Sequence, residues 1–271
     1  MKTPDSIVII AGSGRYPLLL AQCARAAGVK KIYAAAFERE TDREIEKLAD
    51  SVTWMRVGQM GKLLTCLKDS GAKHTVMAGQ IAPNNLFDLR PDLKALMMLA
   101  KIPKRNAESL FGAIAKAIEE IGLEVLPATT FLDEHVASEG PIAGPKLKPR
   151  ELEDIQYGHS IAKEVSRLDI GQTVVVKNGT VLAVEAFEGT NEAILRGGAL
   201  GRGGATMVKV SKPNQDLRFD VPVIGPATLK KAAEAKLRTI AVEAGKTIIL
   251  DREETAAMAV KSGITIFGVK S

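Results

Sequence analysis

Short apolar runs alternate with amphipathic stretches along the first half of the chain. Continuous apolar runs of strand length, as expected for buried parallel strands, lie at 6–11, 31–37, 52–57, 74–78 and 123–126. Between them the apolar residues recur at helical spacing, which predicts helices at 17–27, 41–50, 60–70, 92–101 and 106–121. Thr41 and Glu44 have the spacing of a capping box. This alternation predicts a Rossmann-like α/β domain, with a parallel sheet covered by helices on both faces.

The pattern changes near residue 138. Residues 138–150 read SEGPIAGPKLKPR, with three prolines and no periodicity, which predicts a linker. Asn178 and Gly179 favour a hairpin turn within TVVVKNGTVLAVEA. The other predicted elements are a helix at 151–168, a short helix from Thr190, a strand at 205–211 and two further strand–helix units ending in ITIFGV. This half predicts a mixed α/β domain.

Composition agrees with two α/β domains, 1–137 and 151–271, joined by the linker 138–150. A hydrophobic content of 46% in 271 residues is enough for sizeable cores. The two cysteines, Cys23 and Cys66, have neither metal-site nor disulfide spacing, which suits a reducing cytoplasm. The first apolar run is followed directly by glycine, so we expect it to be a strand and not a signal peptide. No apolar run approaches the ~20 residues of a membrane helix, so we expect a soluble protein.

The formal net charge of +5 favours anionic partners, either a phosphorylated small molecule or an anionic membrane surface. Nucleic acid is not expected, because aromatic residues make up only 4% of the chain and do not alternate with basic ones.

One candidate site lies in the stretch KPNQDLRFDVPVIGP. The two prolines, Pro213 and Pro222, bracket only eight residues, so we predict a strand with Asp216, Arg218 and Asp220 on one face. This face is either a solvated salt-bridge surface or a cation site beside a phosphate-binding arginine. On a strand the two aspartates would be roughly 13 Å apart, so one does most of the catalysis. We choose Asp220, at the strand end, with Arg218 on a phosphate oxygen and Asp216 orienting Arg218.

A second candidate is GSGRYP, where Gly12 and Gly14 lie between a strand and a helix. Such a turn can bind an anion at the helix N-terminus, and Glu38 has the place of a ribose-binding acid. Pro17 stands where the dinucleotide fingerprint has its third glycine. A simple turn that needs glycine for backbone freedom is equally consistent with the sequence.

The third candidate, VEAFEGTNEAILRGGALGRGG, combines carboxylates, glycines and arginines. Gly189 and Thr190 cap a helix, and Arg196 and Arg202 flank a glycine tract that can approach phosphate oxygens. Its alternative is a flexible surface loop. The candidate metal ligands are Asp220, Glu188 and Glu185, and the candidate substrate-binding residues are Gly12, Gly14, Glu188, Gly189, Thr190, Arg196, Arg202 and Lys212.

The three histidines, His74, His135 and His159, are isolated in the sequence, and no nucleophile–histidine arrangement is visible. Carboxylates, arginines and glycines remain, which suit a hard cation that polarises a phosphoryl group towards water. Met97 and Met98 form an apolar patch before the basic run KIPKR. That patch is either a core-facing helix or a surface for acyl chains beside anionic headgroups.

Nearly the whole chain resembles a known family, the UDP-2,3-diacylglucosamine pyrophosphatases of the LpxI type. The resemblance lies in LDIGQTVVVKNGTVLAVEAFEGTNEAILRGG, KPNQDLRFDVPVIGPATL and EAGKTIILDREETAAMAVKSGITIFGV, and more weakly in IAGSGRYP. It implies hydrolysis of the substrate pyrophosphate to UMP and 2,3-diacylglucosamine 1-phosphate in lipid A biosynthesis, with Mg²⁺, or Mn²⁺, as cofactor. It also implies an essential aspartate in the C-terminal domain, which we assign to Asp220 with Asp216 second.

The resemblance further implies an N-terminal substrate-binding domain, a C-terminal catalytic domain, a homodimer and a location at the inner face of the inner membrane. Asn191 and Ala107 stand where the family usually carries acids. Two other functions stay open on the residues alone. One is a non-catalytic nucleotide-sugar binding protein, and the other is a dinucleotide-dependent oxidoreductase that uses Gly12 and Gly14.

Overall fold

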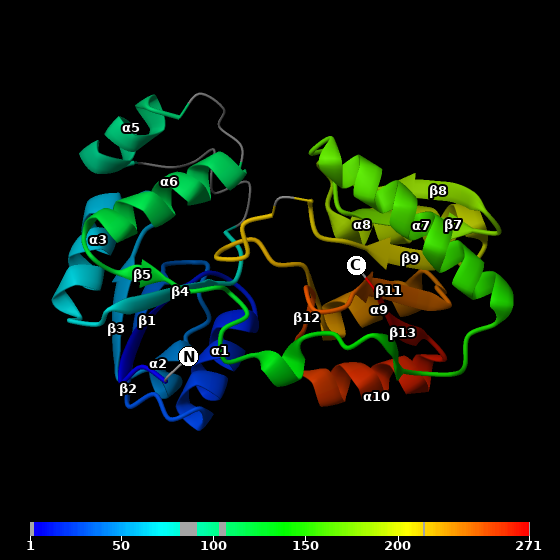
Figure 1. Cartoon of the computed structure of the whole chain (residues 1–271), viewed down its shortest axis with the longest axis horizontal. Coiled ribbons are helices and arrows are strands. Elements are labelled where there is room, and N and C mark those ends of the chain that lie inside the picture. The colour runs from blue at the N-terminus through cyan, green and yellow to red at the C-terminus, as the bar shows by residue number, and fades with distance from the viewer. Residues whose placement is uncertain (1–2, 82–90, 103–106, 214, 271) are drawn as a thin grey trace. The chain divides into compact units, whose positions relative to one another are not determined.

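The computed structural model describes residues 3–81, 91–102, 107–213 and 215–270. Contacts divide the chain into two compact units (Figure 1). Unit 1 comprises Met1–Leu132 and Asp216–Asp220, and unit 2 comprises Asp133–Gln215 and Val221–Ser271. Among the described residues no helix has the length and apolar character needed to cross a membrane.

Unit 1 is built on an all-parallel five-stranded sheet with the order β3-β2-β1-β4-β5. Its strands are β1 (Ser6–Ala11), β2 (Lys31–Phe37), β3 (Ser51–Met55), β4 (His74–Ala78) and β5 (Glu124–Val125). Its helices are α1 (Tyr16–Ala26), α2 (Ile45–Leu48), α3 (Met60–Asp69), α5 (Leu93–Ala100) and α6 (Ala107–Glu120). The order reverses direction between β1 and β4, which is where open α/β sheets bind their ligands.

The two faces of this sheet are covered by different helices (Figure 1). Val8 and Ile10 of β1 pack into one cluster with residues of α3, α5 and α6. The alternate residues Ile7 and Ile9 are fully buried on the other side, where α1 contacts β1 and β4. This confirms the predicted parallel sheet with helices on both faces, because continuous apolar strands have partners on each side.

The predicted helix at 41–50 is much shorter than expected, because α2 spans only Ile45–Leu48. The Thr41 hydroxyl accepts the Phe37 N–H at 2.8 Å and donates to the Ala11 carbonyl. Thr41 therefore ties the ends of two strands together, and the predicted capping box with Glu44 is wrong.

Unit 2 contains a mixed six-stranded sheet with the order β6-β13-β11-β9-β7-β8. Its strands are β6 (Gly140–Ala143), β7 (Thr173–Lys177), β8 (Thr180–Val184), β9 (Thr206–Lys209), β11 (Thr239–Glu243) and β13 (Thr265–Val269), and β10 (Val223–Ile224) and β12 (Ile248–Ile249) form a separate pair. Its helices are η1 (Asp133–His135), α7 (Pro149–Arg167), α8 (Thr190–Gly201), α9 (Pro226–Glu234) and α10 (Arg252–Ser262). The predicted mixed α/β class is therefore confirmed.

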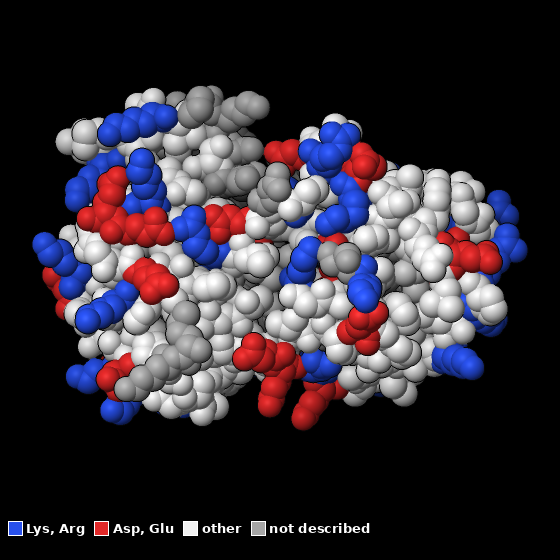
Figure 2. Space-filling view, in the orientation of Figure 1, with Lys and Arg blue, Asp and Glu red and all other residues white. Residues whose placement is uncertain are grey.

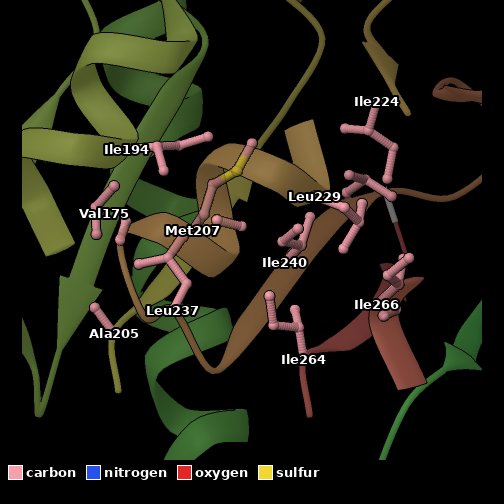
Figure 3. Packing of buried hydrophobic residues seen from close by; sticks show 14 of the residues in the cluster. Val175, Ile194, Ala205, Met207, Ile224, Leu229, Leu237, Ile240, Ile264 and Ile266 are labelled. Carbon is pink, nitrogen blue, oxygen red and sulfur yellow. The ribbon is translucent and has the colours of Figure 1, made fainter. Parts of the chain in front are cut away.

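The two faces of this second sheet are also covered. Val174 and Val176 of β7 pack beneath α7 in one cluster. Val175 points the other way, into the larger core with Ile194 and Ile240 that Figure 3 shows. Because successive side chains of a strand point to opposite faces of the sheet, each of these valines is buried in the core on its own side.

The hairpin between β7 and β8 forms as predicted. Asn178 and Gly179 have φ angles of 54° and 73°, both in the left-handed region that a type I′ turn requires. The buried Asp154 carboxylate accepts both of their N–H groups, at 2.9 and 2.8 Å.

The stretch predicted as the linker 138–150 contains structure instead. Gly140–Ala143 is β6, which pairs antiparallel with β13 at the edge of the sheet, and α7 already begins at Pro149. Proline is tolerated on an edge strand because its missing N–H costs no ladder bond there, so its presence did not exclude a strand.

Candidate functional site

Residues Asp216–Asp220 form a helical turn, and the predicted strand is wrong. The Asp216 carbonyl accepts the N–H of Phe219 at 3.3 Å and the N–H of Asp220 at 3.1 Å. One helical turn separates the two aspartates, so their side chains start about 5–6 Å apart rather than on opposite ends of a strand.

Arg218 is the centre of this turn. Its guanidinium donates to the Asp216 carboxylate from Nε at 2.9 Å and from Nη2 at 2.6 Å, and from Nη1 to Glu119 of α6. The hydrogen bond from Arg218 lowers the pKa of the Asp216 carboxyl, and the same bond raises the pKa of the Arg218 guanidinium. The structure thus shows the predicted contact between Asp216 and Arg218. It also shows Glu119, which lies 99 positions from Arg218 and which no sequence pattern connects with it.

The rest of the turn packs on unit 1. The Phe219 ring stacks on Phe111 of α6 with centroids 5.8 Å apart and an interplanar angle of 26°. The Ala128 N–H donates to the Leu217 carbonyl at 2.7 Å. Since these contacts place the turn in unit 1, the assignment of Asp220 to the C-terminal domain differs from the contact-based division.

Asp220 differs from the other acids of this turn. Its half-buried carboxylate has no hydrogen bond or ion pair with any residue that the structure describes. A carboxylate without a donor among the described residues is open to a cation or to water.

The turn that contains Gly12 and Gly14 lies in unit 1 and pairs with the chain at the end of β4. The Gly12 N–H donates to Ala78 and the Ser13 N–H to Gln80, both at 2.7 Å. A Cβ on Gly12 would lie 2.5 Å from the Gln80 carbonyl oxygen, so the close approach of the chain after β4 requires glycine there. The amides of Gly12 and Ser13 are therefore used within the fold.

A buried tyrosine links this turn to the aspartates. The Tyr16 hydroxyl donates to the Ala128 carbonyl, while the N–H of the same Ala128 binds Leu217. Burial raises the pKa of Tyr16, so the hydroxyl stays a donor over the physiological pH range. Both sequence candidates of unit 1 thus meet at Ala128.

Unit 2 gathers polar side chains at one sheet edge. Strands β8, β9 and β11 run in the same direction, because β8 and β9 are both antiparallel to β7. Following their carboxyl ends, the Thr190 hydroxyl donates to Glu185 at 2.8 Å, and Lys209 donates to Thr190 at 2.8 Å. Ligands of open sheets bind at such edges. Lys209 was not among the residues predicted from the sequence, where its signal is a lysine that ends an apolar strand.

The remaining predicted groups of this edge are already paired. Arg196 donates to Glu188 at 2.6 Å and to the Val184 carbonyl at 2.8 Å. The pKa of Glu188 is lowered by its own backbone N–H and by Arg196. Lys212 forms an ion pair with Asp169.

The predicted glycine-rich phosphate loop does not form. Gly197, Gly198 and Gly201 lie inside α8, where an added Cβ would meet Val175 at 2.5 Å, Ala235 at 2.4 Å and Leu182 at 2.8 Å. They are small because α8 packs closely on its neighbours. Arg202 is the C-cap of α8, six residues or about 9 Å along the helix axis from Arg196, so the two arginines lie on a helix and its end rather than on one glycine loop.

Glu243, at the end of β11, is a second buried polar residue that the sequence pattern did not predict. Its fully buried carboxylate accepts the Ser211 N–H at 2.7 Å, the Ser211 hydroxyl and Lys163 at 2.9 Å, and His159 lies 3.4 Å away. Burial alone would raise its pKa, but the bonds from Ser211 and Lys163 lower it to about 2. The signal was an acid that ends the apolar run TIAVE.

The predicted metal ligands do not form a preformed cage. Glu185 and Glu188 are each bound to protein donors, and only Asp220 is open. Within the part of the chain that the structure describes, no group of three or more histidine, cysteine or acidic side chains is placed to hold a metal ion. The residues fit an ion such as Mg²⁺ that keeps several waters and binds through one carboxylate and substrate phosphates.

The methionine patch divides between surface and core. Leu93, Leu96 and Met97 of α5 are 72%, 50% and 52% exposed, whereas Met98 packs against the core of unit 1. Of the basic run 101–105, only Lys101 and Ile102 belong to the described residues. On the face in Figure 2, basic and acidic side chains are interspersed on each unit, without a continuous basic band.

Two family models together match nearly the whole chain. A family model described as the LpxI N-terminal domain matches residues 6–135, and one described as the LpxI C-terminal domain matches residues 138–267. A curated protein of Caulobacter vibrioides, named UDP-2,3-diacylglucosamine pyrophosphatase LpxI, is 32% identical over 274 residues and is aligned over 96% of both chains.

Proposed function

Because the chain belongs to the LpxI family, we propose that it hydrolyses the pyrophosphate of UDP-2,3-diacylglucosamine in lipid A biosynthesis. The products are UMP and 2,3-diacylglucosamine 1-phosphate. The observation that carries this proposal in the structure is the open Asp220 carboxylate on a turn fixed by Arg218.

Asp220 is the catalytic residue of this proposal. Its carboxylate would hold Mg²⁺ or Mn²⁺, and such an ion would polarise a phosphoryl group towards attack by water. Asp216 keeps Arg218 in place, with its lowered pKa holding it ionised at neutral pH. Arg218 uses three of its five N–H groups on Asp216 and Glu119, which leaves two for a phosphate oxygen.

Unit 2 has a candidate anion position of its own. Lys209 and Thr190 lie at the start of α8, where Gly189 provides no side-chain cap and the first N–H groups are directed outward. A helix N-terminus with an adjacent ammonium group suits a phosphate group. Glu185 orients the Thr190 hydroxyl by accepting its proton at 2.8 Å.

Acyl chains and membrane contact belong to the same proposal. The exposed apolar side chains of α5, flanked by Lys94 and Lys101, suit the acyl chains of the substrate and the anionic headgroups around them. The protein then works at the inner face of the inner membrane as a peripheral enzyme.

The test is release of UMP from UDP-2,3-diacylglucosamine by the purified protein with Mg²⁺ or Mn²⁺, with and without EDTA. We expect UMP and 2,3-diacylglucosamine 1-phosphate in equal amounts, and loss of both with EDTA. The Asp220→Asn variant controls for a contaminating hydrolase, since it keeps the shape of the side chain. If neither metal supports UMP release, the proposal fails, and tight binding of the intact nucleotide sugar would indicate a non-catalytic binding protein.

A further inference from the structure

The Asp220 side chain has no hydrogen bond or ion pair with any described residue, so its placement depends on the turn that carries it. Among the described residues, the turn Asp216–Asp220 contacts the Ala128 N–H and two side chains of α6. These two side chains, Glu119 and Phe111, contact Arg218 and Phe219 of the turn.

We propose that Glu119 and Phe111 are positioning residues that hold the catalytic aspartate turn on α6 and thereby set the place of Asp220. The inference rests on the proposed hydrolase function. Glu119 acts through Arg218, whose side chain is 34% exposed and bridges it to Asp216. Phe111 acts through Phe219, which belongs to the apolar core of unit 1.

Two contacts eight positions apart on one helix prevent the turn from rotating. Phe111 and Glu119 are separated by two turns of α6, about 12 Å, so they hold the turn at both of its sides. The Ala128 N–H closes the third contact at the Leu217 carbonyl. A displacement of a reacting group by about 1 Å costs up to 10²-fold in rate, so positioning of this kind has a kinetic effect.

The kinetic test uses matched variants of the full-length enzyme with Mg²⁺. For Glu119→Gln and for Phe111→Leu we expect kcat to fall about fivefold, equivalent to about 1 kcal/mol, with KM unchanged. Glu119→Asp, which keeps the charge, should recover part of the loss. Glu120→Gln is the control, because Glu120 makes the same charge change on the next, exposed position of α6 without a partner among the described residues.

A structural readout separates this inference from the proposed function. The Ala128 amide is hydrogen-bonded only by the Leu217 carbonyl, so its hydrogen exchange should accelerate in Glu119→Gln and Phe111→Leu but not in Glu120→Gln. Unchanged exchange, or a kcat equal to that of Glu120→Gln, would overturn the positioning role. If the wild-type protein releases no UMP while exchange accelerates as expected, the proposed function fails and the role of both residues in holding the turn stands.

Discussion

Among single residues, Asp220 is expected to matter most for turnover and least for folding. Asp220→Ala should lower turnover at least about 10²-fold, because it removes the open carboxylate that binds the cation. Its melting temperature should stay that of the wild type, since the carboxylate has no partner among the described residues. Asp216→Ala should lose less turnover and more stability, because it removes the bonds to Arg218.

Turnover and thermal melting of both variants are measured beside Asp69→Ala, an exposed acid at the end of α3. An Asp220→Ala enzyme that retains turnover, or one that is inactive only because it is unfolded, contradicts the assignment.

Glu243 provides a pH-dependent contribution to stability. Its pKa is lowered from 4.5 to about 2, so its stabilising effect is complete above pH 4.5 and is lost as the pH falls towards 2. At pH 7, Glu243→Gln should lower the free energy of unfolding by about 3 kcal/mol, because Lys163 loses its buried partner. Urea unfolding at pH 7, 5, 4 and 3 should show this difference shrinking only below pH 4.5.

Glu234→Gln is the control for Glu243→Gln, since Glu234 pairs with Lys231 at the surface, where such pairs contribute less than about 1 kcal/mol. A difference between wild type and Glu243→Gln that stays constant down to pH 3 would exclude the ionised, buried carboxylate.

At the scale of the element, the glycines of α8 act through helix packing. Gly197→Ala should destabilise the protein by about 1–3 kcal/mol, because its Cβ would lie 2.5 Å from Val175, although alanine is the better helix former. Gly112→Ala in α6 is the matched opposite case, with no atom within 4 Å of the added Cβ, and should stabilise by up to about 1 kcal/mol. Urea unfolding of both variants checks the signs, and a stabilising Gly197→Ala would restore the flexible-loop interpretation.

For the whole molecule, we expect peripheral binding to anionic membranes through α5. Replacing Leu96 and Met97 together by Gln should weaken co-sedimentation with phosphatidylglycerol-containing vesicles several-fold, because it removes exposed apolar area beside Lys94 and Lys101. High salt should weaken binding of the wild type as well, in keeping with its net charge of +5. Val260→Gln, at a residue 63% exposed on α10, is the control, and equal loss in that variant would mean that α5 is not the docking surface.

Local pattern determined most of the fold and part of the site. The continuous apolar runs predicted the strands of unit 1, and Asn178-Gly179 predicted the hairpin of unit 2, because these signals are complete within a few residues. Motif residues also pointed to Asp216, Arg218 and Asp220.

Only the tertiary structure decided what those residues do for one another. The alternation of Leu217, Arg218 and Phe219 predicts a strand. Their contacts with Ala128, Glu119 and Phe111, each more than 80 positions away, stabilise a helical turn instead. In the same way, the glycine-rich sequence predicts a phosphate loop, whereas in the structure Gly197 and Gly198 belong to α8 and pack closely on Val175 and Ala235. The chain by itself fixes backbone preference and the side of each element that is buried, whereas partners distant in sequence decide which polar groups are paired and leave Asp220 open.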